Sequence, residues 1–283
     1  MRETSNPVFR SLPKQQGGYA QFGAGAAGAT AQQVHQGYQT DPYVTQQAGV
    51  SRPMTIDDVV TKTGITLAVL SAVAVVSYFL VADNNALAMP FTLIGAFGGL
   101  ALVLVATFGR KQDNPAIVLS YAALEGLFVG AISFLFTNVI VSGANAGVMI
   151  SQAVLATFGV FFGMLVVYKT GAIRVTPKFT RMIVASLFGA LALMIGNLVL
   201  GMFGVGGGAG LGLRDGGPIA IIFSLFVIGL AAFIFLIDFD AADQLIRAGA
   251  PEKAAWGISL GLTVTLVWLY IEILRLLSYF QSD

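Results

Sequence analysis

The sequence predicts an all-α integral membrane protein, a bundle of seven transmembrane helices preceded by a disordered N-terminal tail. Composition is the first observation, because 56% of the 283 residues are hydrophobic and 10% are charged, against about 25% charged residues in a soluble domain. The second is that apolar residues form long blocks instead of amphipathic stripes. The third is that positively charged and uncharged connections alternate between these blocks.

Seven blocks reach the length of about 20 mostly apolar residues that is needed to cross a bilayer core of about 30 Å. The predicted helices are 61–82, 88–109, 115–137, 147–168, 181–204, 217–238 and 256–280. Small residues in "GAFGGLALVLVATFG" and "GALALMIGNLVLG" are expected to let neighbouring helices pack closely.

Residues 1–55 form a separate region, rich in Gln, Gly, Ala and Thr. Such a segment buries too little apolar surface to offset its ordering entropy, so we expect a disordered tail followed by a transmembrane domain over 56–283. Thr55 and Asp58 have the spacing of a capping box, and acidic residues suit the positive end of a helix dipole. The first helix is therefore expected to begin here or just after.

The distribution of Lys and Arg predicts the orientation in the membrane. Of the 15 Lys and Arg residues, thirteen fall on one side, Arg214 alone falls on the other, and Arg275 lies inside the last helix. Because positive loops remain in the cytoplasm, we expect a multi-pass protein of the plasma membrane with a cytoplasmic N-terminus and an outside C-terminus.

Several chemistries are excluded by composition. The chain has no cysteine, and its one histidine, His35, lies in the tail, so the membrane domain has neither a thiol site nor a His-dependent catalytic or metal site. The net charge of +1 and the lack of a basic stripe give no indication of nucleic-acid binding. We predict a protein that is not an enzyme and has no cofactor.

Ionisable residues inside the predicted helices are the candidate functional residues, because burying a charge in a bilayer is costly. They are Glu125 in the third helix, Glu272 and Arg275 in the seventh, and whichever of Asp238 and Asp240 lies deeper in the sixth. Glu272 and Arg275 are three residues apart and can neutralise one another. In a purely structural interpretation, these groups bond to Ser, Thr, Tyr or Asn197 and hold the helices in register.

The three aspartates of "FLIDFDAADQLI" do not form one cluster. At 100° per residue, Asp238 and Asp240 lie about 160° apart around the helix axis, whereas Asp240, Asp243 and Gln244 share a face. One of the two deeper aspartates is expected to point into the bundle, and Asp243 is interpreted as an interfacial charge. Two acids held close together can share a proton, and carboxylate oxygens suit Ca²⁺.

The last two helices, "FLIDFDAADQLI" and "WLYIEILRLLSYF", resemble the Bax inhibitor-1/YccA family, also known as the transmembrane Bax inhibitor motif family. The resemblance covers residues 55–280, and the polar tail with "MTIDDVVTKTGITLAVLSAVAVVSYFLVA" looks like its actinobacterial branch. It implies a bundle around a central helix, with a Ca²⁺ leak gated by protonation of an acidic pair between helices six and seven.

Carried onto this sequence, the resemblance assigns the seventh-helix acid to Glu272, where the family has Asp. The preceding "FLI" favours Asp238 as its partner and the distance to Gln244 favours Asp240; we choose Asp240, with Ca²⁺ assigned to Asp240 and Glu272. The resemblance thus predicts a pH-sensitive calcium-leak channel whose partners are the lipid bilayer, Ca²⁺ and protons.

Two alternative functions remain open at this point. Glu125, Asn197 and Arg275 are also compatible with a proton-coupled transporter of a small solute. The polar tail and the cytoplasmic loops are compatible with a membrane protein that regulates a stress or protease complex without transporting anything.

Overall fold

The computed structural model describes residues 52–141 and 145–281, so residues 1–51 of the predicted tail lie outside the described part of the chain. Within these ranges there are seven helices long and apolar enough to cross a membrane, as predicted. They are α1 (Ile56–Asp83), α2 (Ala88–Phe108), α3 (Pro115–Phe134), α4 (Ala146–Thr170), α5 (Pro177–Met202), α6 (Pro218–Arg247) and α7 (Ala255–Gln281). Four short helical turns accompany them: η2 (Asn85–Leu87), η3 (Leu135–Ile140), η4 (Val205–Gly208) and η5 (Glu252–Ala254).

Helix starts follow local sequence signals. Thr55 caps α1 in the predicted capping box, because its side chain accepts from the backbone N–H of Asp58 and the Asp58 side chain accepts from that of Thr55. Proline occupies the first turn of α3, α5 and α6, where a missing N–H leaves no hydrogen bond broken. These helices begin near the predicted residues because the capping and proline residues satisfy or remove the unpaired N–H groups of a helix start.

The largest difference from the predicted boundaries is at the end of α6, which was expected near residue 238 and continues to Arg247. The acidic and polar residues that end the apolar block do not end the helix, because Asp, Gln and Arg tolerate helical geometry well enough when neighbouring turns continue. The three aspartates therefore lie on the last three turns of a regular helix.

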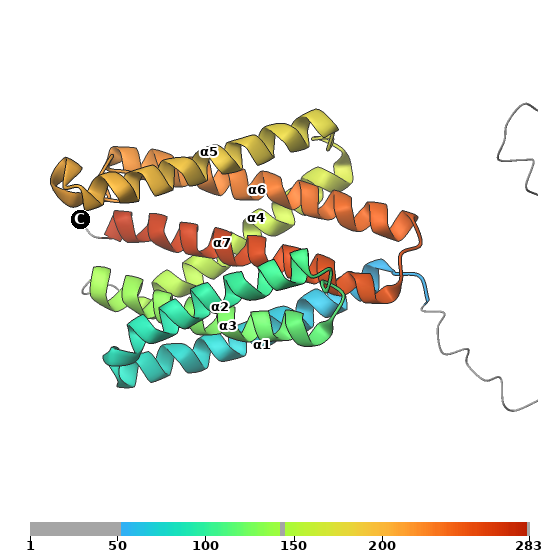
Figure 1. Cartoon of the computed structure of the whole chain (residues 1–283), viewed down its shortest axis with the longest axis horizontal. Helices are drawn as coiled ribbons and strands as arrows, with labels where there is room; N and C mark the ends of the chain where they lie inside the picture. Colours follow the sequence, from blue (N-terminus) through green and yellow to red (C-terminus); the bar gives the residue numbers. More distant parts are fainter. Residues whose placement is uncertain (1–51, 142–144, 282–283) are drawn as a thin grey trace, which may run out of the picture. The chain divides into compact units, whose positions relative to one another are not determined.

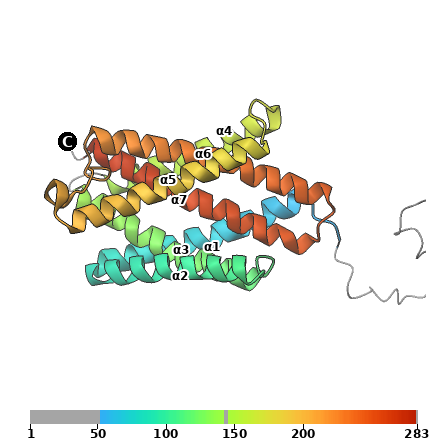
Figure 2. The same ribbon diagram turned by 45° about the horizontal axis from the view of Figure 1, so that its top comes forward.

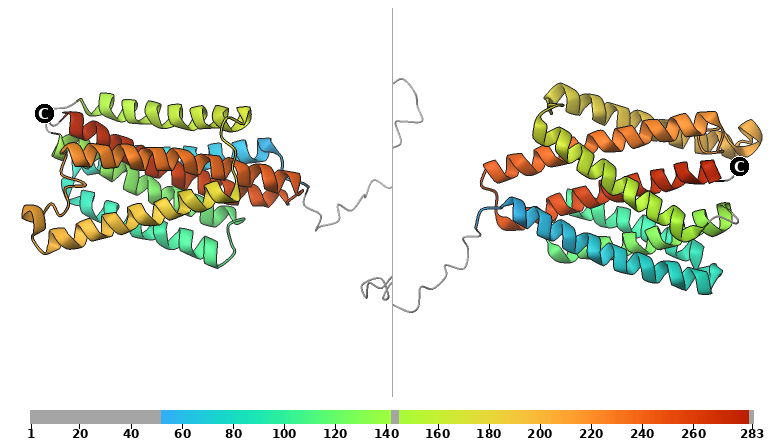
Figure 3. Two further views of the ribbon diagram at one scale, coloured as in Figure 1. Left: turned by 90° about the horizontal axis from the view of Figure 1, so that it is seen from above. Right: turned by 180° about the vertical axis from the view of Figure 1, so that it is seen from behind.

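Helix α7 occupies the middle of the bundle and is the most buried of the seven described helices. It packs against α6 on one side and against α1 and α3 on the other, as Figure 1 and Figure 2 show. Helix α4 runs across another face of the bundle, where it contacts α6 and α7 (Figure 3). Helix α5 packs mainly against α6 and leaves most of its apolar surface facing outward. The arrangement around a central helix agrees with what the family resemblance implied.

Small residues account for the close packing of α1, α2 and α3. A Cβ atom on Gly95 of α2 would lie 2.6 Å from the carbonyl oxygen of Leu124, and one on Gly126 of α3 would lie 2.6 Å from that of Leu70. The expected close packing is thus found for the small residues of α2. It is not found at Gly189 and Gly196 of α5, where an added Cβ would meet open space.

Residues 52–55, assigned to the tail by composition, are held against the α6–α7 connection. The N–H of Met54 donates to the carbonyl oxygen of Ala250 over 2.8 Å, and the N–H of Glu252 donates to that of Arg52 over 3.0 Å. Arg52 also forms an ion pair with Glu252. Residues 52–55 therefore belong to the folded bundle although composition assigned them to the tail.

An ion pair joins the α2–α3 connection to η5, the turn that precedes α7, with Lys253 Nζ 2.8 Å from Asp113 Oδ2. The hydrogen bond from Lys253 lowers the pKa of Asp113. Because the folded-state pKa lies below the unfolded value of about 3.9, the pair stabilises the fold above about pH 4 and loses its contribution as the pH falls through the folded-state pKa.

We expect Asp113→Asn to lower the free energy of unfolding at pH 7 by less than about 1 kcal/mol, because both side chains are partly exposed and solvent screens the pair. The difference between the variant and the wild type should shrink as the pH falls through the lowered pKa of Asp113, because both then carry a neutral side chain. Thermal melting of the purified protein against pH checks this. A difference that grew toward acid pH would contradict the assignment.

Candidate functional site

Glu272 lies on α7 inside the bundle, with only 2% of its side chain exposed. Arg214 Nη1 donates to both carboxylate oxygens, over 2.7 Å to Oε1 and 3.1 Å to Oε2. Arg275 Nη1 donates to Oε2 over 2.8 Å, and Ser224 Oγ of α6 donates to Oε1 over 2.8 Å. One buried carboxylate is thus held by two guanidinium groups and a hydroxyl, a charge-assisted arrangement.

The two arginines reach Glu272 from different directions. Arg275 is on α7 itself, one turn beyond Glu272, and its guanidinium lies 5.8 Å from the ring centroid of Phe136. Arg214 comes from the connection between α5 and α6, and its guanidinium lies 5.4 Å from the ring centroid of Phe223. With two positive charges against one negative charge, this cluster as it stands repels a free cation.

Asp238 is the aspartate of α6 that points toward α7. Its Oδ2 accepts a hydrogen bond from Thr265 Oγ1 over 2.8 Å, and its Oδ1 lies 3.9 Å from the position of a Cβ built on Gly261. The prediction that one of the two deeper aspartates points into the bundle is met by Asp238. Asp240, which we had chosen for that position, does not point toward α7.

Asp240 and Asp243 face α4 instead. The hydroxyl of Tyr168 on α4 lies 3.4 Å from Asp240 Oδ1 and 3.3 Å from Asp243 Oδ2, and Gln244 Nε2 donates to Asp240 Oδ2 over 2.6 Å. Asp243 also forms an ion pair with Arg247. The predicted common face of Asp240, Asp243 and Gln244 is therefore present.

The predicted pair of Asp240 and Glu272 is not formed in this structure. Asp238, the aspartate that does reach α7, meets it at Thr265, seven residues before Glu272, which corresponds to roughly 10 Å along a helix. Two carboxylates at that spacing cannot share a proton. The acids of α6 and α7 are thus separate sites at different depths, and their part in gating stays a prediction.

Glu125 and Asn197 have different surroundings. Glu125 of α3 lies beside Tyr121, and Gly99 of α2 leaves room for its carboxyl group, because a Cβ there would be 2.7 Å from Oε1. Its Oε2 is buried and accepts no hydrogen bond from any residue of 52–141 or 145–281. Asn197 of α5 instead holds the following loop, since its Oδ1 accepts from the N–H of Leu211 over 2.7 Å.

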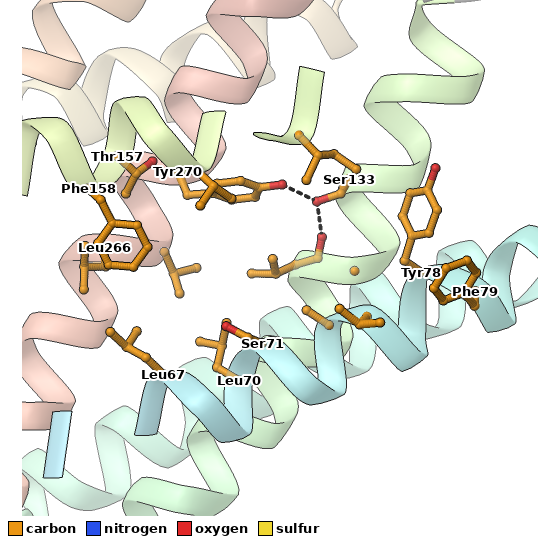
Figure 4. A pocket seen from close by; sticks show the side chains of 17 residues that line it. Leu67, Leu70, Ser71, Tyr78, Phe79, Ser133, Thr157, Phe158, Leu266 and Tyr270 are labelled. Atoms are coloured by element: carbon orange, nitrogen blue, oxygen red, sulfur yellow. Dashed lines mark hydrogen bonds between the residues drawn. The ribbon is translucent and has the colours of Figure 1, made fainter. Parts of the chain in front are cut away.

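A pocket of about 300 Å³ lies on the side of α7 turned away from Glu272, between α1, α3, α4 and α7. Figure 4 shows Tyr270 and Ser133 joined by a hydrogen bond of 2.7 Å at its wall, with mainly apolar side chains around them. Tyr270 and Glu272 are about 200° apart around the helix. The pocket is therefore separate from the charged cluster, and its apolar walls do not suit a hard cation.

No group of three or more His, Cys, Asp or Glu residues that could hold a metal ion occurs among residues 52–141 and 145–281. The predicted Ca²⁺ site at Asp240 and Glu272 is not assembled in this conformation, because Asp240 faces Tyr168 on α4. The expectations that the protein has no cofactor and no enzymatic activity stay predictions.

Sequence reasoning missed the residues that contact the two acids from elsewhere in the chain. Arg214 is 58 positions from Glu272, Ser224 is 48, and Thr265 is 27 from Asp238. Arg214 did carry one signal, as the one positive residue among the connections of its side of the membrane. A lone cation in a glycine-rich loop next to buried acids could have been proposed as their partner.

A bundle of seven apolar helices, with a buried and paired carboxylate on its central helix, defines a multi-pass membrane protein with a charged cluster inside the bundle. A family model described as Bax inhibitor 1 like matches residues 6–282. The chain therefore belongs to the Bax inhibitor 1 like family, which confirms the resemblance seen in its last two helices. No curated protein matches it. The particular membrane and the orientation of the termini stay predictions.

Proposed function

We propose that this protein is a pH-sensitive calcium-leak channel of the plasma membrane, with its N-terminus in the cytoplasm. The observation that carries the proposal is Glu272, a carboxylate with a 2% exposed side chain on the central helix of a Bax inhibitor 1 like bundle. An ionisable residue inside a membrane protein is costly and marks an ion or proton pathway by default.

The proposed path follows the interface of α6 and α7. Asp238 and Thr265 offer oxygen atoms at one level of this interface, and Glu272 and Ser224 offer them at another. Carboxylate and hydroxyl oxygens are hard ligands that suit Ca²⁺. Two weak sites in succession permit conduction, because an ion must bind well enough to enter and weakly enough to leave.

The pH-sensitive step is proposed to lie at the acids of the α6–α7 interface, Asp238 and Glu272. The charged and titratable groups around Glu272 are Arg214 from the α5–α6 connection and Arg275 and Tyr279 from α7, with Ser224 as the neutral contact from α6. The charge of Glu272 holds the two guanidinium groups together, and without that charge they would repel one another across a medium of low dielectric constant. The leak is therefore expected to change with pH.

We expect Asp238→Asn to reduce Ca²⁺ flux into liposomes several-fold, because the amide is a poorer ligand for Ca²⁺ and carries no charge. Asp240→Asn is the matched control, since it makes the same change on the same helix but at a residue that faces Tyr168 on α4. Flux is measured with a Ca²⁺-sensitive dye inside vesicles at several pH values.

Equal flux for the wild type and both variants would exclude the proposed path along α6 and α7. Solute uptake driven by a proton gradient, with no passive Ca²⁺ flux, would instead support the proton-coupled transporter.

A further inference from the structure

The connection between α5 and α6, residues 203–217, turns back against the bundle. Leu213 is 8% exposed and packs with Phe223 and Val227 of α6 and with Met194 and Trp268. The next residue, Arg214, has a side chain that is only 22% exposed although it belongs to a loop. The loop therefore inserts two consecutive side chains, one apolar and one cationic.

Asn197 fixes the loop in this position. Its Oδ1 accepts hydrogen bonds from the N–H of Leu211 over 2.7 Å and of Leu213 over 3.5 Å, directly before Arg214. Gly210 allows the close approach, because it has a φ of 67° and a Cβ there would overlap the carbonyl oxygen of Asn197. Any other residue at 210 would be strained in this conformation.

Arg214 binds the carboxylate oxygens that a free cation would bind. It donates to both oxygens of Glu272, and Ser224 Oγ lies 2.8 Å from one of them. A Ca²⁺ ion at this level would need the same carboxylate oxygens. The guanidinium group and a free cation therefore compete for one site.

Arg275 and Arg214 differ in how they are attached to the chain near Glu272. Arg275 is on α7, three residues from Glu272, and donates to Oε2 alone. Its backbone is part of the central helix. Arg214 belongs to a glycine-rich loop, with eight glycines within 203–217, so it can withdraw while α7 stays in place.

We propose that Arg214 is a tethered cation that fills the cation site formed by Glu272 and Ser224 and so closes the path between α6 and α7, with Asn197 as the positioning residue. Closure of a Ca²⁺ path rests on the proposed function, whereas occupation of the site by a guanidinium group does not. A permeating ion must displace Arg214, which makes this residue determine how readily cations enter.

The first test is Ca²⁺ flux through Arg214→Ala in liposomes. We expect a several-fold increase over the wild type, and added guanidinium chloride, far below denaturing concentrations, should return the flux of this variant toward the wild-type level. Arg181→Gln, a change at an exposed arginine of α5, should leave the flux unchanged. Arg214→Ala with wild-type flux and no response to guanidinium overturns the proposal.

The second test concerns Asn197. Asn197→Leu removes the acceptor that holds the loop, so Arg214 should leave the site more often and the flux should rise. Guanidinium should lower this flux as it does for Arg214→Ala, because the site is again empty. Asn197→Asp retains the acceptor oxygen and should keep the flux low. Equal flux in Asn197→Leu and Asn197→Asp would contradict the positioning role.

Guanidinium binding separates this proposal from the proposed function. Guanidinium should raise the melting temperature of purified Arg214→Ala, but not that of Arg214→Ala/Glu272→Gln, where the carboxylate is missing. If this selective stabilisation is found in a protein that passes no Ca²⁺, the proposed cation site is supported and the proposed calcium-leak function is refuted. If Ca²⁺ flux is found without this stabilisation, the proposed role of Arg214 as a tethered cation is refuted and the calcium-leak function is supported.

Discussion

Glu272→Gln is expected to destabilise the protein by about 3 kcal/mol, because removing one partner of a buried ion pair leaves uncompensated charge in a low-dielectric interior. Here the change leaves two guanidinium groups, those of Arg214 and Arg275, facing each other with no anion between them. Thermal melting in detergent should show a clear drop in the midpoint at neutral pH.

Glu272→Asp is the matched control, since it keeps the charge and shortens the side chain by one methylene group. We expect it to lose much less stability than Glu272→Gln. A triple variant that replaces Arg214, Glu272 and Arg275 with apolar residues should recover most of the loss, because no buried charge remains. Equal melting of the Gln and Asp variants would show that charge at residue 272 does not stabilise the fold.

Gly130→Ala is the second change with a large expected effect, about 2 kcal/mol of destabilisation or more. A Cβ at Gly130 of α3 would overlap the carbonyl oxygen of Ala74 and would lie 2.6 Å from the Cβ of Ser77 on α1. Ser77 cannot yield easily, because its hydroxyl donates to the carbonyl oxygen of Leu127 over 2.8 Å. Helices α1 and α3 must therefore separate.

Gly159→Ala on α4 makes the same substitution in a helix where an added Cβ meets no atom within 4 Å. This control should be neutral or slightly stabilising, since alanine favours helices over glycine. The comparison is made by melting both variants in the same detergent. Gly130→Ala with the stability of Gly159→Ala would show that α1 and α3 can move apart at little cost.

The helices were predictable because the signals for them are local. Apolar blocks of sufficient length, a capping box at Thr55 and Asp58 and prolines at helix starts all lie within a few residues of the structure they specify. The end of α6 was misplaced because an apolar block marks what contacts lipid, whereas the helix continues for as long as backbone hydrogen bonds can form.

The candidate site was predictable in part. Helical periodicity separated Asp238 from Asp240 and placed Glu272 and Arg275 on one face, and both results agree with the structure. Periodicity could not say which of the two aspartates faces α7, because that depends on the rotation of α6 within the bundle. The family pattern favoured an acidic pair, and the structure holds each acid with other partners.

The sequence by itself determined that this chain is a seven-helix membrane protein of the Bax inhibitor 1 like family with acids on its last two helices, because length, hydropathy and local motifs are properties of short segments. Only the tertiary structure decided that Glu272 is paired with Arg214 from a loop 58 residues away. A contact of that kind depends on where the loop between α5 and α6 folds. Arg214 thereby takes the place beside Glu272 that the sequence had assigned to Asp240.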